Sequence, residues 1–95
     1  MIYPLTNEEL VLYALATVEI VQLIDVRSRT QVQIRGIITE KLDIYTDLVD
    51  IKEACRLLRQ KGLIKYDVDE YEPYEDLSYL ITATGKKVAR SRKYI

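Results

Sequence analysis

The chain has no histidine, tryptophan or phenylalanine, and only one cysteine, among its 95 residues. The absence of histidine excludes most zinc and haem sites, together with Ser-His and Cys-His catalysis. A single cysteine cannot form a disulfide within the chain. We interpret Cys55 as a core residue, because it falls on the apolar face of a predicted helix; a reactive thiol or an intermolecular bridge is the alternative.

The motifs of common enzyme classes are missing too. The sequence contains no glycine-rich phosphate loop, no pair of carboxylates placed for acid–base chemistry and no metal-ligand spacing. We therefore expect neither enzyme activity nor a cofactor or metal site. No apolar run is long enough to cross a bilayer and the N-terminus lacks a secretory signal, so we expect a cytoplasmic protein.

Charge is nearly balanced overall but unevenly distributed. The 14 basic and 15 acidic residues give a net charge of −1. Residues 27–42 contain four basic side chains and one acidic one, residues 62–82 contain six acidic side chains and one lysine, and residues 83–95 contain five basic side chains. Because a nucleic acid responds to the local field, this segregation matters more than the total. With 48% hydrophobic residues, residues 1–95 make one domain with a single core.

The stretch 46–64 carries the pattern around which we expect the fold to be organised. Its apolar residues recur at steps of three and four, which places them on one face of a helix. These residues are Leu48, Ile51, Cys55 and Leu58. Thr46 is the expected N-cap, and Gly62 supplies the left-handed residue that ends the helix before an extended segment.

A long first helix is expected over about residues 7–26. Thr6 and Glu9 have the spacing of a capping box, and nearly all residues after them are apolar. A helix of this kind must be covered on more than one side, so we expect a homodimer. Its contacts are assigned to Leu12, Tyr13, Ala16, Ile20 and Leu23. Two alternatives stay open, namely a central helix covered by its own domain alone, and a strand at 18–26 paired with residues 31–37.

Two further helical stretches are expected. Thr30 suits the N-cap of a helix over about residues 31–42, whose apolar residues again share one face. Together with the glycine-terminated helix that follows, it predicts a helix-turn-helix at about residues 31–61.

The remaining residues predict a hairpin and a terminal helix. Alternating apolar and polar residues indicate strands on either side of an acidic, proline-containing loop, within a wing at about residues 63–83. A C-terminal helix is expected at about residues 85–94, with Thr84 or Gly85 near its cap.

This order of elements is that of a winged helix, and two motifs carry the likeness. The first is Ile51-x-x-Ala54-Cys55-x-x-Leu58-x-x-x-Gly62-Leu63-Ile64, and the second is Tyr79-x-Ile81-Thr82-x-Thr84-Gly85-Lys86. Through these residues the chain resembles the small PadR-type and MarR-type regulators of archaea, bacteria and archaeal viruses. The resemblance covers about residues 31–89. It implies an α+β winged helix-turn-helix with three helices, a two-stranded wing and a C-terminal helix.

The resemblance also implies a function. It implies sequence-specific binding of double-stranded DNA by a homodimeric transcriptional regulator, with the second helix of the motif in the major groove. Base-reading residues would be Tyr45, Thr46, Val49, Lys52, Glu53 and Arg56. Phosphate contacts would come from Arg27, Arg29, Arg35, Lys41 and Arg59.

The acidic residues between 67 and 76 oppose this function at the wing. Their charge would repel phosphates, so we expect the wing tip to point away from DNA or to meet a basic partner. A solvated turn that protects an edge strand is an equal interpretation. The alternative function is a protein-interaction module that uses this acidic wing, with Tyr71 and Tyr74, as its contact surface.

The basic residues between Lys86 and Lys93 also have two interpretations. They form a solvated helix face that pairs with the acidic wing or with Glu8, Glu9 and Glu19 of a partner, or they follow DNA phosphates. We favour the first, because the apolar residues Val88 and Tyr94 are too few to bury this helix deeply.

Overall fold

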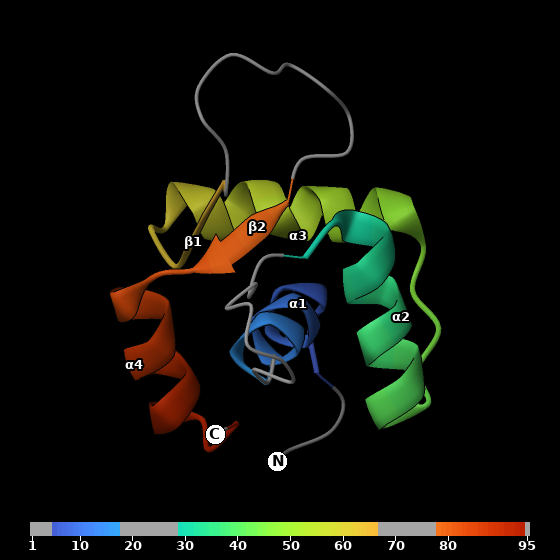
Figure 1. Cartoon of the computed structure of the whole chain (residues 1–95), viewed down its shortest axis with the longest axis horizontal. Helices are drawn as coiled ribbons and strands as arrows, with labels where there is room; N and C mark the ends of the chain where they lie inside the picture. Colours follow the sequence, from blue (N-terminus) through green and yellow to red (C-terminus); the bar gives the residue numbers. More distant parts are fainter. Residues whose placement is uncertain (1–4, 18–28, 67–77, 95) are drawn as a thin grey trace, which may run out of the picture.

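The computed structural model describes residues 5–17, 29–66 and 78–94 of the chain (Figure 1). Its elements are, in order, α1 (Asn7–Ala16), α2 (Gln31–Leu42), α3 (Leu48–Gln60), β1 (Ile64–Tyr66), β2 (Tyr79–Ile81) and α4 (Ala83–Ser91). The expected fold class, α+β with three helices, a two-stranded hairpin and a C-terminal helix, is confirmed. Within these ranges no helix has both the length and the apolar character that a bilayer crossing requires.

Helix α1 occupies the centre of the molecule. In Figure 1 it is seen nearly along its axis, with α3 across one side and α2 and α4 flanking it. Its buried residues point in several directions and include Leu10, Val11, Leu12, Ala14 and Leu15. The chain's own elements therefore cover most of the apolar surface of residues 7–16. This arrangement agrees with the alternative of a central helix covered by its own domain.

This burial corrects one of the expected dimer contacts. Leu12 is only 4% exposed within its own domain, so its side chain has no surface to offer a second copy. Tyr13 and Ala16 are partly buried against the same core. Ile20 and Leu23 lie outside the described residues, as does the part of the predicted first helix at 18–26.

The starts of the first two helices agree with the sequence patterns. The hydroxyls of Thr6 and Thr30 each accept a hydrogen bond from the backbone N–H three residues later, and the side chains of Glu9 and Gln33 each accept one from the backbone N–H of the cap residue. Residues 31–37 are helical, so the alternative in which they pair as a strand with residues 18–26 is wrong. The reason is the complete capping box at Thr30, which commits the following residues to a helix.

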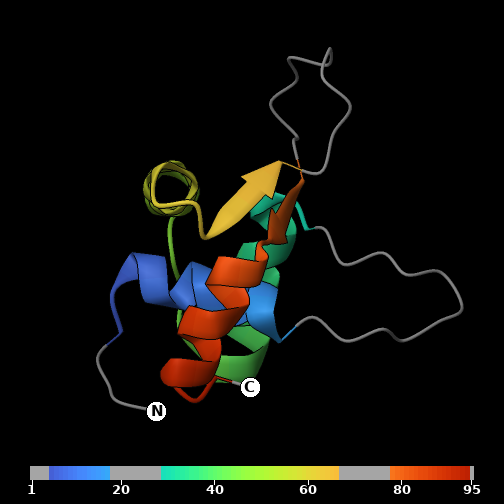
Figure 2. The ribbon, with the colours of Figure 1, turned by 90° about the vertical axis from the view of Figure 1, so that its left-hand side faces the viewer.

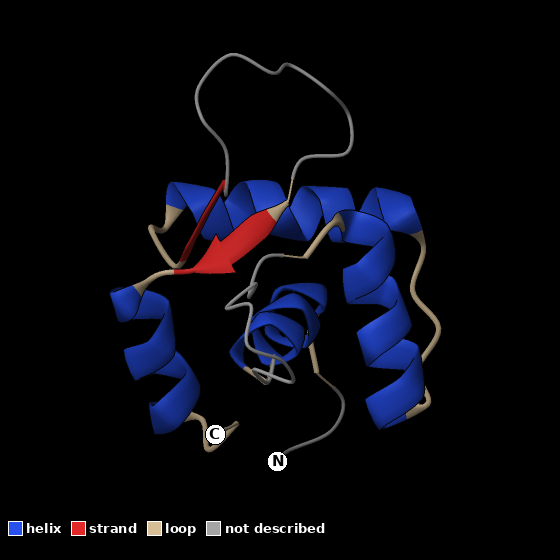
Figure 3. Cartoon of the chain, in the orientation of Figure 1, coloured by secondary structure: helices blue, strands red, loops and turns tan. Residues whose placement is uncertain are grey.

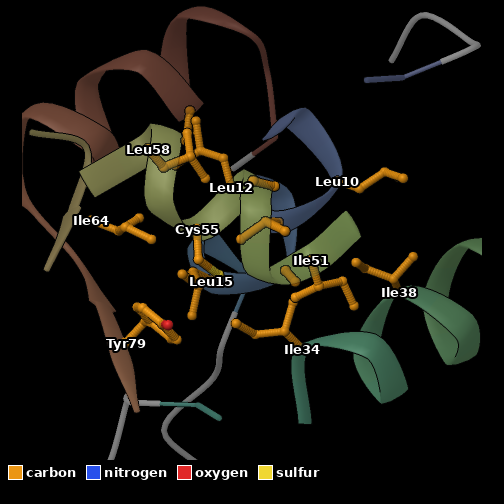
Figure 4. Packing of buried hydrophobic residues seen from close by; sticks show 14 of the residues in the cluster. Leu10, Leu12, Leu15, Ile34, Ile38, Ile51, Cys55, Leu58, Ile64 and Tyr79 are labelled. Atoms are coloured by element: carbon orange, nitrogen blue, oxygen red, sulfur yellow. The ribbon is translucent and has the colours of Figure 1, made fainter. Parts of the chain in front are cut away.

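Helix α3 packs its predicted face on α1 and α2. Ile51, Ala54, Cys55 and Leu58 are all buried. Figure 4 shows Cys55 beside Leu15 of α1, and Ile51 beside Ile34 of α2. Gly62 has a φ of 74°, as expected for the left-handed residue that ends the helix and turns the chain into β1. Figure 2 views α3 nearly end-on, with the hairpin beside it and α1 beneath.

The sheet contains one pairing that the sequence pattern did not indicate. Strands β1 and β2 are antiparallel, with Ile64 opposite Ile81 and Tyr66 opposite Tyr79 (Figure 3). On the other side of β2, the backbone of Arg29 exchanges two hydrogen bonds with Tyr79, at N···O distances of 3.1 and 2.9 Å. The residue that precedes the cap of α2 is thereby fixed to the base of the wing.

Thr82 joins the end of α3 to the start of α4. Its hydroxyl donates to the carbonyl oxygen of Gly62 at 2.7 Å and accepts from the N–H of Gly85 at 3.0 Å. Thr82 is therefore the N-cap of α4, which begins at Ala83, and the assignment of the cap to Thr84 or Gly85 is wrong. Those two residues lie inside the first turn, because the strand ends early enough for the threonine that follows it to cap the helix.

The C-terminal residues are bound to the start of α1 in the same chain. Arg92 donates to Glu9 at 2.9 Å, and the Tyr94 hydroxyl donates to the same carboxylate oxygen at 3.1 Å. The Tyr94 ring meets that of Tyr13 edge to face, with centroids 5.7 Å apart. The expectation of a weakly buried terminal helix is wrong, because Ala89 is fully buried and Tyr94 is 8% exposed.

Two glycines offer a matched test of this packing. A Cβ at Gly85 would overlap the carbonyl oxygen of Leu63 and lie 2.7 Å from Cγ1 of Ile81, whereas a Cβ at Gly36 meets nothing within 4 Å. We expect Gly85→Ala to lower the free energy of unfolding by at least ~2 kcal/mol. Gly36→Ala, in the middle of α2, should raise it by ~0.5–1 kcal/mol. Urea denaturation of both variants checks this, and equal effects would contradict the packing at Gly85.

Glu9 makes the stability dependent on acid. The pKa of Glu9 is held below its ordinary value of 4.5, first by the Thr6 N–H and then by Tyr94, the Thr6 hydroxyl and Arg92, against the opposing effect of burial. Because the folded pKa is below the unfolded one, the stabilisation is present above about pH 4.5 and is lost as the pH falls through the folded pKa. We expect the melting temperature of the wild type to fall more steeply below pH 4.5 than that of Glu9→Gln; parallel curves would contradict this.

Candidate nucleic-acid interface

The outer face of α3 is the most exposed helical surface that carries predicted site residues. Val49 at its start is 76% exposed, and Tyr45 in the preceding turn is 73% exposed. Lys52, Glu53 and Arg56 are exposed on the same helix. Five of the six residues predicted to read bases are thus available to a partner, while the opposite face of α3 is buried in the core.

Thr46 is the exception, and its assignment as a base reader and N-cap is corrected. It is 7% exposed, and its hydroxyl is buried without a hydrogen-bond partner among the described residues. Asp47 is the N-cap of α3, although its side chain makes no capping hydrogen bond. The cause is the preceding turn, in which Asp43 adopts a left-handed conformation with φ 55°. That turn brings the chain into α3 with Thr46 facing inward.

Arg56 is held in place by Glu53, one turn before it on α3. Its Nε donates to Glu53 Oε2 at 3.0 Å, and its Nη2 donates to the other carboxylate oxygen. This forked hydrogen bonding lowers the pKa of Glu53 and raises that of Arg56. The pair is half exposed, so water screens it and parting it costs little. The guanidinium of Arg56 is therefore oriented by Glu53 and still has N–H groups that can donate to another acceptor.

The predicted phosphate-binding residues are spread over several elements. Arg35 is partly exposed on α2, and Lys41 at the end of α2 donates to the carbonyl oxygen of Thr17 at 3.2 Å. Arg29 is partly exposed beside the wing, where its backbone pairs with β2. Arg27 lies outside the described residues. Arg59 lines the same hollow as Arg56, and Arg35 and Lys41 belong to α2.

Arg59 has a partner that the sequence pattern did not reveal. Its guanidinium carbon lies 3.9 Å from the centroid of the Tyr66 ring, and its Nη1 donates to the Tyr66 hydroxyl at 2.7 Å. Beside them is an open hollow of about 470 Å³. Its lining residues are Arg56, Arg59, Gln60, Ile64, Lys65 and Tyr66. Tyr66 and Lys65 were predicted only as strand residues, because helical spacing says nothing about contacts across the turn at Gly62.

Two observations concern metal binding and thiol chemistry in the described part of the chain. No group of three or more cysteine and acidic side chains there is placed to hold a metal ion. Burial raises the pKa of the Cys55 thiol to about 12, so the thiol stays protonated and unreactive near neutral pH. Cys55 is a core residue, as predicted.

Comparison with known proteins supports one assignment. No family model matches the chain, and no curated protein matches it. Among solved structures, it is similar to a MarR family regulator from Neisseria meningitidis, with 29% sequence identity over 92% of this chain and a TM-score of 0.61. The fold is a winged helix. The chain spans about half the length of that regulator, since the match covers 51% of it.

In the winged helix, each part of the candidate interface has a defined place. Helices α2 and α3 form the helix-turn-helix, and β1 and β2 form the base of the wing. The hollow at Arg59 lies where the second helix of the motif meets the wing. Residues 67–77, which include the acidic wing segment and its tyrosines, lie outside the described residues.

Thr46 provides a test of whether its hydroxyl is buried without a partner. Replacing it by valine removes a buried hydroxyl that lacks a hydrogen bond and keeps the shape of the side chain. We expect Thr46→Val to leave the free energy of unfolding unchanged or to raise it by up to ~1 kcal/mol, as measured by urea denaturation. A loss of more than about 1 kcal/mol would mean that the hydroxyl has a stabilising partner after all.

Proposed function

We propose that the chain binds double-stranded DNA sequence-specifically and acts as a transcriptional regulator. The observation that carries this proposal is the two-sided character of α3. Its inner face, with Ile51, Cys55 and Leu58, is buried, while the face with Val49 and Arg56 is open to solvent. A rigidly docked helix with a free polar face is the element that enters a major groove in helix-turn-helix proteins. The similar solved structure is that of a regulator, which is in keeping with the proposal.

The exposed residues of α3 have side chains suited to base edges. Arg56 suits guanine, because its free N–H groups can donate to the O6 and N7 acceptors. Val49 suits the methyl group of thymine, and Glu53 can accept from the amino group of cytosine. Lys52 and Tyr45 flank this row. Glu53 has a second role, since it orients Arg56 before DNA arrives.

Phosphate contacts are proposed for the basic residues around this row. Arg59 on α3 and Lys41 at the end of α2 are exposed, and Arg35 on α2 and Arg29 near the wing are partly exposed. Arg27, the fifth predicted phosphate contact, lies outside the described residues. Asp47 and Asp50 at the start of α3 are acidic and would repel a phosphate there. We therefore place the contacts with the DNA backbone toward the C-terminal half of α3.

We propose further that the regulator is a homodimer. Of the predicted contact residues on α1, Leu12 is buried, while Tyr13 and Ala16 are partly exposed and available for a contact. Ile20 and Leu23, the other two predicted contacts, lie outside the described residues. Two copies would present two α3 helices to half-sites one turn of DNA apart. The resemblance to PadR-type regulators, and an archaeal or viral source, stay predictions.

The alternative, a protein-interaction module that uses the acidic wing, depends on residues 67–77. These lie outside the described residues, so this alternative stays a prediction. DNA binding is therefore the function that the described side chains support best.

Charge reversal on the two helices of the motif tests the proposal. Wild type should bind a mixed pool of duplexes with an affinity that falls steeply with salt, and Arg35→Glu or Arg56→Glu should weaken binding at least ~10-fold. Fluorescence anisotropy across a salt series measures both quantities. Light scattering of the complex should show two chains on each duplex.

Lys87→Glu is the matched control. It makes the same reversal at an exposed position of α4, which packs against α1 rather than lining the outer face of α3. It should leave binding close to wild type. Failure of the wild type to bind any duplex at low salt would refute the proposed function, and one chain on each duplex would refute the dimer.

A further inference from the structure

The hollow between the end of α3 and β1 has the composition of an anion site. Three of its six lining residues, Arg56, Arg59 and Lys65, are cationic, and none is acidic. Gln60 and Tyr66 add neutral groups that can donate hydrogen bonds. Arginine, lysine, glutamine and tyrosine are all among the side chains that contact phosphate oxygens in DNA complexes.

Arg59 in this hollow is held by a column of packed side chains. The Tyr66 ring, on which Arg59 stacks, lies 5.3 Å from the ring of Tyr79, measured between centroids. Tyr79 is buried, and its hydroxyl accepts from Gln31 Nε2 of α2 at 3.0 Å. The column thus runs from the start of α2 through the base of the wing to α3. A guanidinium stacked in this way loses little further freedom when it binds a ligand.

The hydroxyl hydrogen of Tyr66 can donate a hydrogen bond to a ligand. Its hydroxyl oxygen accepts from Arg59 Nη1 at 2.7 Å, so the hydroxyl hydrogen is not used in that contact. The hydrogen is available to a second acceptor in the hollow. An oxygen ligand that meets Arg59 can therefore take one bond from the guanidinium and one from the tyrosine.

We propose that this hollow seats one phosphate of the DNA backbone, bound by Arg59, Lys65 and the hydroxyl of Tyr66. The inference rests on the proposed function and adds to it a specific site at the junction of α3 and the wing. Tyr66 has two tasks, since it positions Arg59 by stacking and donates its own hydrogen to the phosphate. Arg56 borders the seat and keeps its role toward the bases.

The site explains how the wing contributes despite its acidic loop. Lys65 is the single basic residue in the stretch 62–82, and it is exposed on β1 beside the end of α3. The base of the wing therefore supplies the positive charge that the loop lacks. A phosphate seated here would fix the register of α3 in the groove without any contact from residues 67–77.

Three substitutions separate the tasks of these residues. Tyr66→Phe keeps the ring and removes the hydroxyl, and should raise the Kd for the duplex pool about tenfold through the loss of hydrogen bonding to a charged group. Tyr66→Leu also removes the stack and should weaken binding further. Lys65→Gln should reduce the slope of log Kd against log salt by about 0.9, the value for one phosphate contact.

Lys87→Gln is the matched control for Lys65→Gln, because both lysines are exposed and lose the same charge. It should leave the Kd and the salt slope unchanged. Thermal unfolding identifies a variant that fails to fold. Tyr66→Phe keeps the partly buried ring and Lys65→Gln alters an exposed side chain, so these two decide the result if Tyr66→Leu is unstable.

The outcomes distinguish the seat from the proposed function. Weaker binding by Tyr66→Phe together with the reduced slope of Lys65→Gln supports the seat. Wild-type binding by both variants, while Arg56→Glu still weakens binding, overturns the seat and leaves the proposed function standing. Absence of any duplex binding by the wild type overturns both.

Discussion

The packing of α3 on α1 is the contact on which the rest of the molecule depends. Ile51, Cys55 and Leu58 of α3 are buried, and Cys55 lies beside Leu15 of the central helix (Figure 4). This contact decides which face of α3 is buried and which face stays exposed to solvent. It also fixes the exit of α3 at Gly62, from which the wing begins. The outer face of α3 depends on this packing, because a helix must be immobilised before its outer residues can discriminate between partners.

The fold was predictable where its determinants are local in sequence. The spacing of Ile51, Cys55 and Leu58, the capping residues at Thr6 and Thr30, and the left-handed Gly62 each act within a few residues, so a pattern reveals them. The cap of α4 was misplaced because strand and helix meet at Thr82 without an intervening loop. The depth of Leu12 and Tyr94 could not be predicted, since it depends on what packs around α1 from elsewhere in the chain.

In the candidate interface too, features that are local in sequence were predictable and contacts between distant residues were not. Helical periodicity correctly placed Val49, Lys52, Glu53 and Arg56 on the outside of α3. Thr46 was misplaced because it belongs to a turn, whose direction is set by the left-handed Asp43 and not by helical spacing. Contacts that cross the fold left no periodic signal at all. Arg59 on Tyr66, and Gln31 on Tyr79, join residues whose separation in sequence matches no regular element.

The backbone pairing of Arg29 with Tyr79 has a consequence for self-association. Strand β2 has neighbours on both sides, with β1 on one and Arg29 on the other. An unpaired strand edge recruits strands from other molecules, and long apolar edges promote aggregation. Within the described residues, the edge that β1 presents is three residues long and has the charged Lys65 at its centre. This described edge is therefore a poor template for intermolecular sheet growth.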